Sequence, residues 1–315
     1  MKCTQNSYKA IAASNHPQER ILSVTRWFIS TLWGSYASRC TDGSSEKKPY
    51  NPILGEQFHC SLEDIKCVCE QVCHLPPISA FYLENEKAGV SLNGHCGQKS
   101  KFKGTAIKVE QVGRATLYLK QYDEQYMINF PDLLIRGVLS GSCYLELSEI
   151  STIASTNGSK AVIEFLPKPW FGGEHNHIRG SIMWNGITTL RGDLRLLFDA
   201  EAEPMAQRVT LPHDDQQEIE SHRLWGRVTR ALKAKNYQAA NAQKTRIEEW
   251  QRKLRQERAE RNETWAPALF NFQPDQQAKD EYTRRNVLLL KSMEGKPLLD
   301  DGAWIFKHSL HKRTF

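Results

Sequence analysis

The sequence predicts a mainly β protein of the α+β class, built on one long antiparallel sheet with helices before and after it. Between about residues 50 and 200, short segments rich in Val, Ile, Tyr and Phe alternate with Gly, Asn, Asp and Pro. Before this region apolar residues follow a helical period, and after it a Pro-free stretch is rich in charged residues. A sheet this long must curl or close to protect its edges, so a barrel and a sandwich are the two candidate architectures.

The first 45 residues are expected to be an N-terminal helical segment. Apolar residues between 18 and 38 recur at spacings that fit one face of a helix, namely Ile21, Leu22, Val24, Trp27, Phe28 and Leu32. The segment 41–49 is polar and contains Gly and Pro, which indicates a loop that leads into the sheet.

The predicted β region covers residues 46–215. Its strands are expected in segments such as AFYLEN, GVSLNG, TLYLKQY, CYLELSEI, AVIEFLP, HIRGSIMW and LRLLF. A closed sheet of many strands leaves an interior that side chains alone cannot fill. If the sheet closes, the pattern therefore predicts a hollow protein.

A basic helical region is expected over residues 216–265, and a tail packed on the outside over 266–315, all within a single domain of residues 1–315. Residues 223–261 contain 12 Lys plus Arg and 4 Glu, a local excess of +8, whereas the net charge of the whole chain is +6. The positive charge is therefore concentrated in these helices. Pro267, Pro274 and mixed polar residues predict an irregular tail.

The composition favours a cytoplasmic protein that contacts membranes peripherally. No apolar run approaches the roughly 20 residues needed to cross a bilayer, and the N-terminus lacks the apolar core of a secretory signal. The 8 cysteines are scattered along the chain, which favours reduced thiols over a disulfide framework.

A first motif, KKPYNPILGE, spans residues 47–56. Its two prolines hold the chain extended. Lys48 offers a point charge for a phosphate, and Asn51 offers a carbonyl and two donors. The same residue types would also suit an ordinary loop that enters a strand.

A second motif, EQVCHLPP, spans residues 70–77. A predicted strand ends at the double proline, and His74 lies just before it. This histidine could donate a hydrogen bond to an anion from a fixed backbone, or it could simply face solvent at the end of the strand.

A third motif lies in the basic helical region. Lys244, Glu248 and Arg252 are spaced i, i+4 and i+8, so they share one stripe of a helix. A carboxylate between two cations can hold both for a phosphate, and the planar fork of arginine suits that ligand. A solvated face with intrahelical ion pairs, worth about 0.3–0.5 kcal/mol each, is the alternative.

Two further patterns are similar to a metal site and to a receptor-docking motif. Cys67, Cys69, Cys73 and His74 lack the two-residue knuckle and the second ligand pair of a zinc site, so no metal is expected. The segment 197–201, LFDAE, is similar to the acidic motif that docks on endoplasmic-reticulum receptors, although its position inside the folded region argues against that partner.

Taken together, the three motifs resemble the signature set of the oxysterol-binding-protein-related family. The family fingerprint EQVSHHPP reads EQVCHLPP here, and KKPxNPxLGE is present as KKPYNPILGE. VTRWFISTL and TRIEEWQRKLR are also similar to short fungal members. The similarity covers about residues 18–265, with a weaker echo at 304–306.

The resemblance implies a near-complete antiparallel β-barrel around a lipid tunnel that carries a sterol or phosphatidylinositol 4-phosphate. By motif position, the phosphoinositide headgroup would be bound by Lys48, Asn51, His74, Lys244, Glu248 and Arg252. The sterol or acyl tunnel would include Trp27, Ser35, Tyr36, Ile53 and Leu54. Neither an enzymatic activity nor a cofactor is implied.

Four departures from the family pattern affect this expectation. Leu75 replaces the second histidine of the fingerprint, which removes a phosphate donor, and Cys73 replaces its serine. Only 17 residues precede the first predicted helix, fewer than the amphipathic lid of the family requires. Ser35 lies where a glutamine commonly meets the sterol hydroxyl.

The expected function is non-enzymatic lipid binding and transfer between membranes, with an anionic membrane surface as partner. The alternative is a lipid sensor or scaffold with a degenerate pocket that does not transfer lipid. Nucleic-acid binding through the basic helix is disfavoured, because the β region shows no array of basic and aromatic residues on one face.

Overall fold

The computed structural model describes residues 5–32, 50–139, 141, 143–169, 177–193, 207–293, 301–308 and 310. Lys48, Ser35, Tyr36, the LFDAE segment and the second part of the predicted N-terminal helix lie outside these residues. None of the helices in the described ranges is both long enough and apolar enough to pass through a bilayer.

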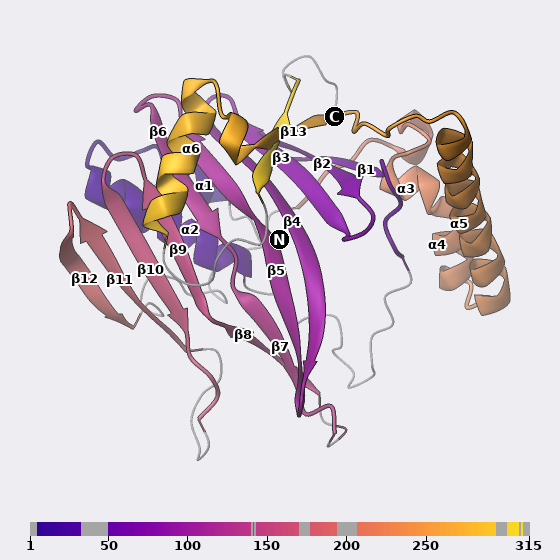
Figure 1. Cartoon of the computed structure of the whole chain (residues 1–315), viewed down its shortest axis with the longest axis horizontal. Coiled ribbons are helices and arrows are strands. Elements are labelled where there is room, and N and C mark those ends of the chain that lie inside the picture. The colour runs from indigo at the N-terminus through magenta and orange to yellow at the C-terminus, as the bar shows by residue number, and fades with distance from the viewer. Residues whose placement is uncertain are drawn as a thin grey trace.

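One sheet of 12 strands dominates the molecule (Figure 1). Its strands are β1 (Gln57–Leu62), β2 (Ile65–Cys73), β3 (Ile78–Asn85), β4 (Val90–Lys103), β5 (Ala106–Leu119), β6 (Glu124–Asn129), β7 (Asp132–Arg136), β8 (Tyr144–Ser148), β9 (Ile150–Ser155), β10 (Ser159–Phe165), β11 (Ile178–Trp184) and β12 (Ile187–Asp193). All paired neighbours are antiparallel. The mainly β, antiparallel prediction is therefore confirmed.

The strand order follows the chain with one excursion. It runs β1-β2-β3-β4-β5-β6-β9-β10-β11-β12, while β7 pairs with the lower part of β5 and β8 pairs with β7. In the described ranges β1 and β12 are the two end strands of the curled sheet, and no strand pairing joins them. The outer edge of β1 is covered instead by the chain after residue 207, through reciprocal hydrogen bonds between Ser61 and Val209.

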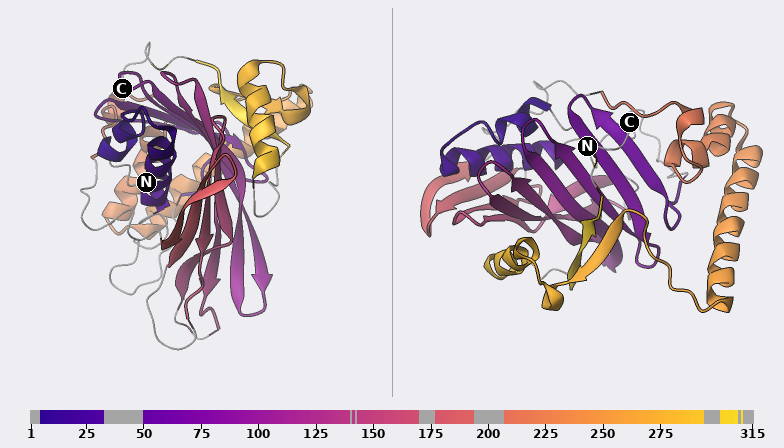
Figure 2. Two further views of the ribbon diagram at one scale, coloured as in Figure 1. Left: turned by 90° about the vertical axis from the view of Figure 1, so that its left-hand side faces the viewer. Right: turned by 90° about the horizontal axis from the view of Figure 1, so that it is seen from above.

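Helix α2 (Pro17–Leu32) fills the inner face of the curled sheet, next to the short helix α1 (Gln5–Ala10) (Figure 2). Proline suits the first position of a helix, where its missing N–H is not needed. The apolar stripe that the sequence predicts, including Ile21, Val24 and Trp27, is buried against residues from β1 through β11. This is the main core of the molecule.

A buried ion pair also attaches α2 to the sheet. Arg20 donates to both carboxylate oxygens of Glu124, at 2.9 and 2.5 Å, and the Tyr126 hydroxyl donates to the same carboxylate at 2.6 Å. Burial alone would raise the pKa of Glu124, but the hydrogen bonds from Arg20, Tyr126 and Asn157 outweigh it and lower the pKa.

The C-terminal tail covers the opposite face of the sheet (Figure 2, right). It contains β13 (Phe270–Pro274), the single turn η3 (Asp275–Gln277), α6 (Glu281–Ser292) and β14 (Gly302–Phe306). The side chain of Asn93 donates to the Trp304 carbonyl at 2.7 Å and accepts from the Phe306 N–H at 2.9 Å, which fixes β14 on β4. Arg114 forms a buried ion pair with Asp275.

The prediction of an irregular tail is therefore wrong, although the tail does pack on the outside. Asp280 caps α6, because its carboxylate accepts from the Thr283 backbone N–H at 2.9 Å. The pairing of β13 with β14 joins segments about 30 residues apart in sequence. Such pairing has no local signal in the sequence.

The basic region forms three helices at one end of the sheet, α3 (Ser221–Leu224), α4 (Gly226–Lys233) and α5 (Tyr237–Glu260), after the single turn η2 (His213–Asp215). Asn236 starts α5 by accepting from the Ala239 N–H at 3.0 Å. Trp225, Val228 and Ala240 bury a small apolar cluster around Ile53. The basic helices are therefore attached to the chain that enters β1.

Candidate functional site

A polar pocket of about 160 Å³ lies between α5 and the start of the sheet. Its wall combines three segments that are far apart in sequence, and its residues are Asn51, Ile53, His74, Glu248, Gln251, Arg252 and Arg255. Each of the three sequence motifs therefore contributes to one site.

Glu56, the last residue of the 47–56 motif, holds that motif in place. Its carboxylate accepts from the Ile53 N–H at 3.0 Å, the Trp225 indole at 3.0 Å and the Ser221 hydroxyl at 2.6 Å. Three donors satisfy a buried carboxylate, so this side chain has a structural role. It fixes the loop that carries Asn51 onto α3 and α4.

Three more hydrogen bonds align this loop with the second motif and with α5. The Gly55 N–H donates to the Gln71 carbonyl at 2.9 Å, and the Gln71 N–H donates to the Glu56 carbonyl at 2.9 Å. The Leu54 N–H donates to the side-chain oxygen of Gln251 at 3.1 Å. Gly55 has φ +83°, with Trp265 3.4 Å from where a Cβ would lie, so this turn favours glycine.

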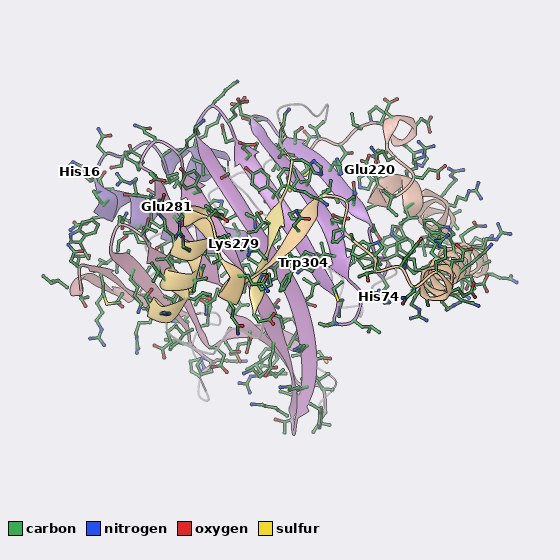
Figure 3. All side chains as sticks on the ribbon, turned by 45° about the horizontal axis from the view of Figure 1, so that its top comes forward. His16, His74, Glu220, Lys279, Glu281 and Trp304 are labelled. Carbon is green, nitrogen blue, oxygen red and sulfur yellow. The ribbon has the colours of Figure 1, made fainter. Side chains whose placement is uncertain are left out.

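His74 lies in the turn between β2 and β3, facing α5 (Figure 3). Its Nδ1 is buried and has no hydrogen-bond partner among the described residues. A buried polar atom of this kind normally meets water or a ligand. Leu75, the next residue, is 79% exposed and is not part of the pocket wall.

Glu70, at the start of the second motif, lies outside the pocket and binds the tail. Its carboxylate accepts from the backbone N–H groups of Ala268 and Leu269, each at 2.7 Å. Burial raises the pKa of Glu70, while these two backbone donors act in the opposite direction. The fingerprint thus contains one structural carboxylate and one histidine that faces the pocket.

Of the residues predicted for the headgroup, Asn51, His74, Glu248 and Arg252 meet in the polar pocket. Lys244 does not line it, but its ammonium lies 4.0 Å from a Glu248 carboxylate oxygen, one helical turn away. Lys48 lies outside the described residues. Gln251 and Arg255 were not predicted from the sequence, although both lie on the same helical stripe as Glu248.

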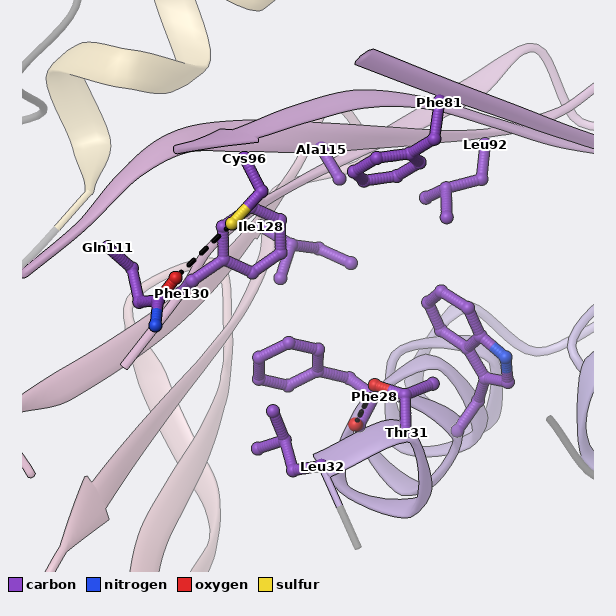
Figure 4. Close-up of a pocket in the computed structure, with 11 residues that line it drawn as sticks. Phe28, Thr31, Leu32, Phe81, Leu92, Cys96, Gln111, Ala115, Ile128 and Phe130 are labelled. Carbon is purple, nitrogen blue, oxygen red and sulfur yellow. Dashed lines mark hydrogen bonds between the residues drawn. The ribbon is translucent and has the colours of Figure 1, made fainter. Parts of the chain in front are cut away.

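A second, apolar pocket of about 230 Å³ lies between α2 and the inner face of the sheet (Figure 4). It is lined by Trp27, Phe28, Thr31, Leu32, Phe81, Leu92, Cys96, Gln111, Ala115, Ile128 and Phe130. Of the residues predicted for the tunnel, Trp27 lines this pocket. Ile53 lies instead in the polar pocket and the Trp225 cluster, and Leu54 lines neither pocket.

The apolar pocket contains few polar groups. The Cys96 thiol lies 3.2 Å from the Gln111 side-chain oxygen, and the Thr31 hydroxyl donates to the Phe28 carbonyl at 2.7 Å (Figure 4). Both polar side chains are thus hydrogen-bonded within the protein, Thr31 to its own helix and Gln111 to the thiol of the neighbouring strand. Neither Gln111 nor Cys96 carries a local sequence signal for this position.

The described residues contain no group of three or more His, Cys, Asp or Glu side chains that could hold a metal ion. Cys60 and Cys67 face each other across β1 and β2, and both are free thiols.

The fold and the two pockets define a class of protein: a curled antiparallel sheet that holds an apolar cavity on its inner face, with a separate polar pocket against a basic helix. A model of the oxysterol-binding-protein family matches residues 5–230 of the chain. The chain belongs to this family, and the resemblance predicted from the three motifs is confirmed.

Curated relatives support the same membership. The chain is 38% identical over 296 residues to Protein kes1 of Schizosaccharomyces pombe, a match that covers 85% of this chain and 76% of that protein. It is 32% identical over 326 residues to Protein KES1 of Mycosarcoma maydis, covering 94% and 83%. Oxysterol-binding protein-related protein 9 of Mus musculus is 33% identical over 305 residues, covering 84% of this chain and 41% of that protein.

Solved structures share the fold. The Osh1 ORD domain in complex with ergosterol superimposes with a TM-score of 0.67 at 19% identity, covering 96% of this chain and 76% of that one. The Osh3 ORD of Saccharomyces cerevisiae in complex with PI(4)P gives the same TM-score and identity, covering 89% and 82%.

Proposed function

We propose that this chain binds a sterol, phosphatidylinositol 4-phosphate or both, and transfers them between membranes without making or breaking a covalent bond. The observation that carries the proposal is the pairing of an apolar pocket with a separate cationic pocket assembled from three distant segments. The solved relatives hold ergosterol in one case and PI(4)P in another.

The two pockets suit the two ends of such a lipid. Burial of the sterol or acyl body would be driven by the removal of apolar surface from water, at about 25 cal/mol per Å². A sterol hydroxyl would meet the Gln111 amide. A phosphate would be bound by Arg252, His74 and Asn51, together with Lys48 from the undescribed part of the first motif.

Membrane association would be peripheral and electrostatic. Helix α5 exposes several cations, and each Lys or Arg near an anionic surface contributes about 1 kcal/mol. A second basic element is the β4–β5 hairpin, where residues 98–105 are all exposed. Three lysines of this hairpin, Lys99, Lys101 and Lys103, lie on one face of β4, and the exposed ring of Phe102 lies on the other.

The direct test is lipid transfer between vesicles by the wild type and a Lys48→Ala, Arg252→Ala double variant. The double variant should lose transfer of phosphatidylinositol 4-phosphate by at least about tenfold, because a lost hydrogen bond to a charged group costs roughly 1.5–3 kcal/mol. Its uptake of sterol should stay at the wild-type level, since Arg252 does not line the apolar pocket.

A matched control is the Lys233→Ala, Lys253→Ala double variant. It removes the same charge from exposed positions of α4 and α5 that do not line the polar pocket. If both double variants transfer the phosphoinositide as well as the wild type, the polar pocket is not its binding site.

A second candidate function is a lipid sensor or scaffold that does not transfer lipid. Two observations favour it: Leu75 supplies no donor, and the apolar pocket of 230 Å³ is smaller than the roughly 300–1,000 Å³ of pockets that bury drug-sized ligands. Membrane binding by the wild type without extraction of any lipid would select this alternative.

A further inference from the structure

We propose that Arg255 is a second guanidinium ligand of the headgroup phosphomonoester, so that this chain binds the phosphate with two arginines of α5. The inference rests on the proposed phosphoinositide binding and adds a residue to its site. Position 75 of the fingerprint supplies no donor, because Leu75 is apolar and 79% exposed.

The helical geometry places Arg255 beside Arg252. Residues 248, 251, 252 and 255 are spaced i, i+3, i+4 and i+7, which is one continuous face of α5. All four line the polar pocket, opposite Asn51 and His74. Two guanidinium groups one turn apart can donate to different oxygens of one phosphate.

The contacts around α5 leave both arginines available for a ligand. Lys244 lies 4.0 Å from Glu248, and Lys253 lies 3.8 Å from Glu257. Within the described part of the chain, Arg252 and Arg255 have neither an ion-pair partner nor a hydrogen-bond partner, and both are exposed. They can therefore bind an anion without breaking an existing interaction.

The charges of the pocket fit a phosphomonoester. Arg252 and Arg255 contribute two positive charges, and Glu248 contributes one negative charge. Lys244, which lies 4.0 Å from Glu248, offsets that negative charge, so Arg252 alone would leave a net charge of about +1 on this face of α5. A phosphomonoester carries about −1.5 to −2 at pH 7, and the second arginine raises the positive charge of this face to match it.

The test measures binding to phosphatidylcholine vesicles that contain either phosphatidylinositol 4-phosphate or phosphatidylserine at equal total charge. Arg255→Gln should weaken binding to the phosphoinositide vesicles by about tenfold, the loss expected for one bond to a charged group. Binding to the phosphatidylserine vesicles should change about equally in Arg255→Gln and in the control Lys253→Gln, which removes the same charge outside the pocket.

Two further measurements separate a ligand role from a structural one. Soluble inositol 1,4-bisphosphate should bind the wild type about tenfold more tightly than Arg255→Gln, and Arg255→Lys should fall between them, because lysine keeps the charge but not the fork. The melting temperature of Arg255→Gln should match that of the wild type, since Arg255 has no described partner to lose.

The outcomes are distinguishable. Wild-type affinity of Arg255→Gln for the phosphoinositide, together with loss of binding in Arg252→Gln, would overturn the role of Arg255 alone. An equal loss on both kinds of vesicle would also overturn it, since Arg255 would then act on membrane charge in general. A wild-type protein that binds no phosphoinositide would overturn the proposed headgroup site and Arg255 with it.

Discussion

Individual carboxylates in the sequence motifs hold the backbone so that neighbouring polar side chains face the pocket. Glu56 accepts three hydrogen bonds from α3, α4 and its own loop, and Glu70 accepts two from the backbone of the tail. Substitution of either should therefore reduce stability as well as binding. Among the described residues of these two motifs, Asn51 and His74 are left to contact a ligand.

Gly94 lies directly beside Phe81 and Ala115, two residues that line the apolar pocket, and its substitution gives a prediction at the residue scale. A Cβ at this position would lie 2.6 Å from the tip of the Phe81 ring and 2.8 Å from the Cβ of Ala115. Gly94→Ala should therefore push the Phe81 ring into the cavity, weaken binding of a fluorescent sterol several-fold and lower stability by about 1–3 kcal/mol.

Sterol binding per folded molecule is the quantity to compare for Gly94→Ala, with Ser100→Ala on the exposed part of β4 as control. Wild-type sterol binding by folded Gly94→Ala would mean that the ring does not limit the pocket.

At the scale of elements, the sequence predicts helices and strands that follow a local periodicity, but it does not predict which distant strands pair. The short apolar strands and the amphipathic α2 follow local periodicities, so the mainly β class and the N-terminal helix are predictable. The pairing of β6 with β9 and the excursion of β7 and β8 depend on contacts between distant residues, for which the sequence has no local signal. Outer-face polar residues such as Asn93 and Arg114 are buried only because the tail covers them.

The same reasoning applies to the site. The three motifs identify Asn51, His74 and the α5 stripe, because their residue types suit a phosphate and their order is similar to the family signature. Gln111 and Arg255 belong to the pockets only through the curvature of the sheet and the docking of α5. Neither the curvature of the sheet nor the docking of α5 has a local signature in the sequence.

The attachment of α2 to the sheet leads to a prediction about pH. The lowered pKa of Glu124 means that its ion pair with Arg20 stabilises the fold above about pH 4.5, the ordinary value of a glutamate, and that this contribution is lost as the pH falls through the lowered value. Glu124→Gln should therefore reduce the free energy of unfolding by about 3–5 kcal/mol at pH 7, because it leaves a buried arginine unpaired.

Urea unfolding at pH 7 and at pH 3.5 would measure this effect, and the deficit of Glu124→Gln relative to the wild type should shrink at the lower pH. The control is Glu281→Gln, which removes an exposed ion-pair partner of Arg285. It should lower the free energy of unfolding by less than about 1 kcal/mol. If Glu124→Gln is as stable as the wild type at pH 7, or if the difference in stability does not change with pH, the ion pair of Arg20 with Glu124 does not stabilise the fold as expected.

The distribution of charge over the whole molecule determines how it would approach a membrane. The excess of +8 in residues 223–261 exceeds the net charge of +6, so the remainder of the chain is slightly acidic overall. Against this background the β4–β5 hairpin is a distinct basic element that projects from the sheet (Figure 1). Leu139 is 73% exposed and lies at the same end, because β7 runs antiparallel to β5.

The charge of this hairpin leads to a prediction about how the whole molecule binds a membrane. Replacement of Lys99, Lys101 and Lys103 by glutamine should weaken binding to vesicles rich in anionic lipid by at least tenfold, since each lysine near the surface contributes about 1 kcal/mol. Phe102 is 65% exposed, so Phe102→Ser should further weaken binding to these vesicles by removing an apolar ring that can enter the headgroup region.

The control replaces Lys120, Lys279 and Lys291, which are exposed outside the hairpin. Sedimentation with vesicles at low and moderate salt measures both triple variants, and an equal loss in the two would show that only net charge matters.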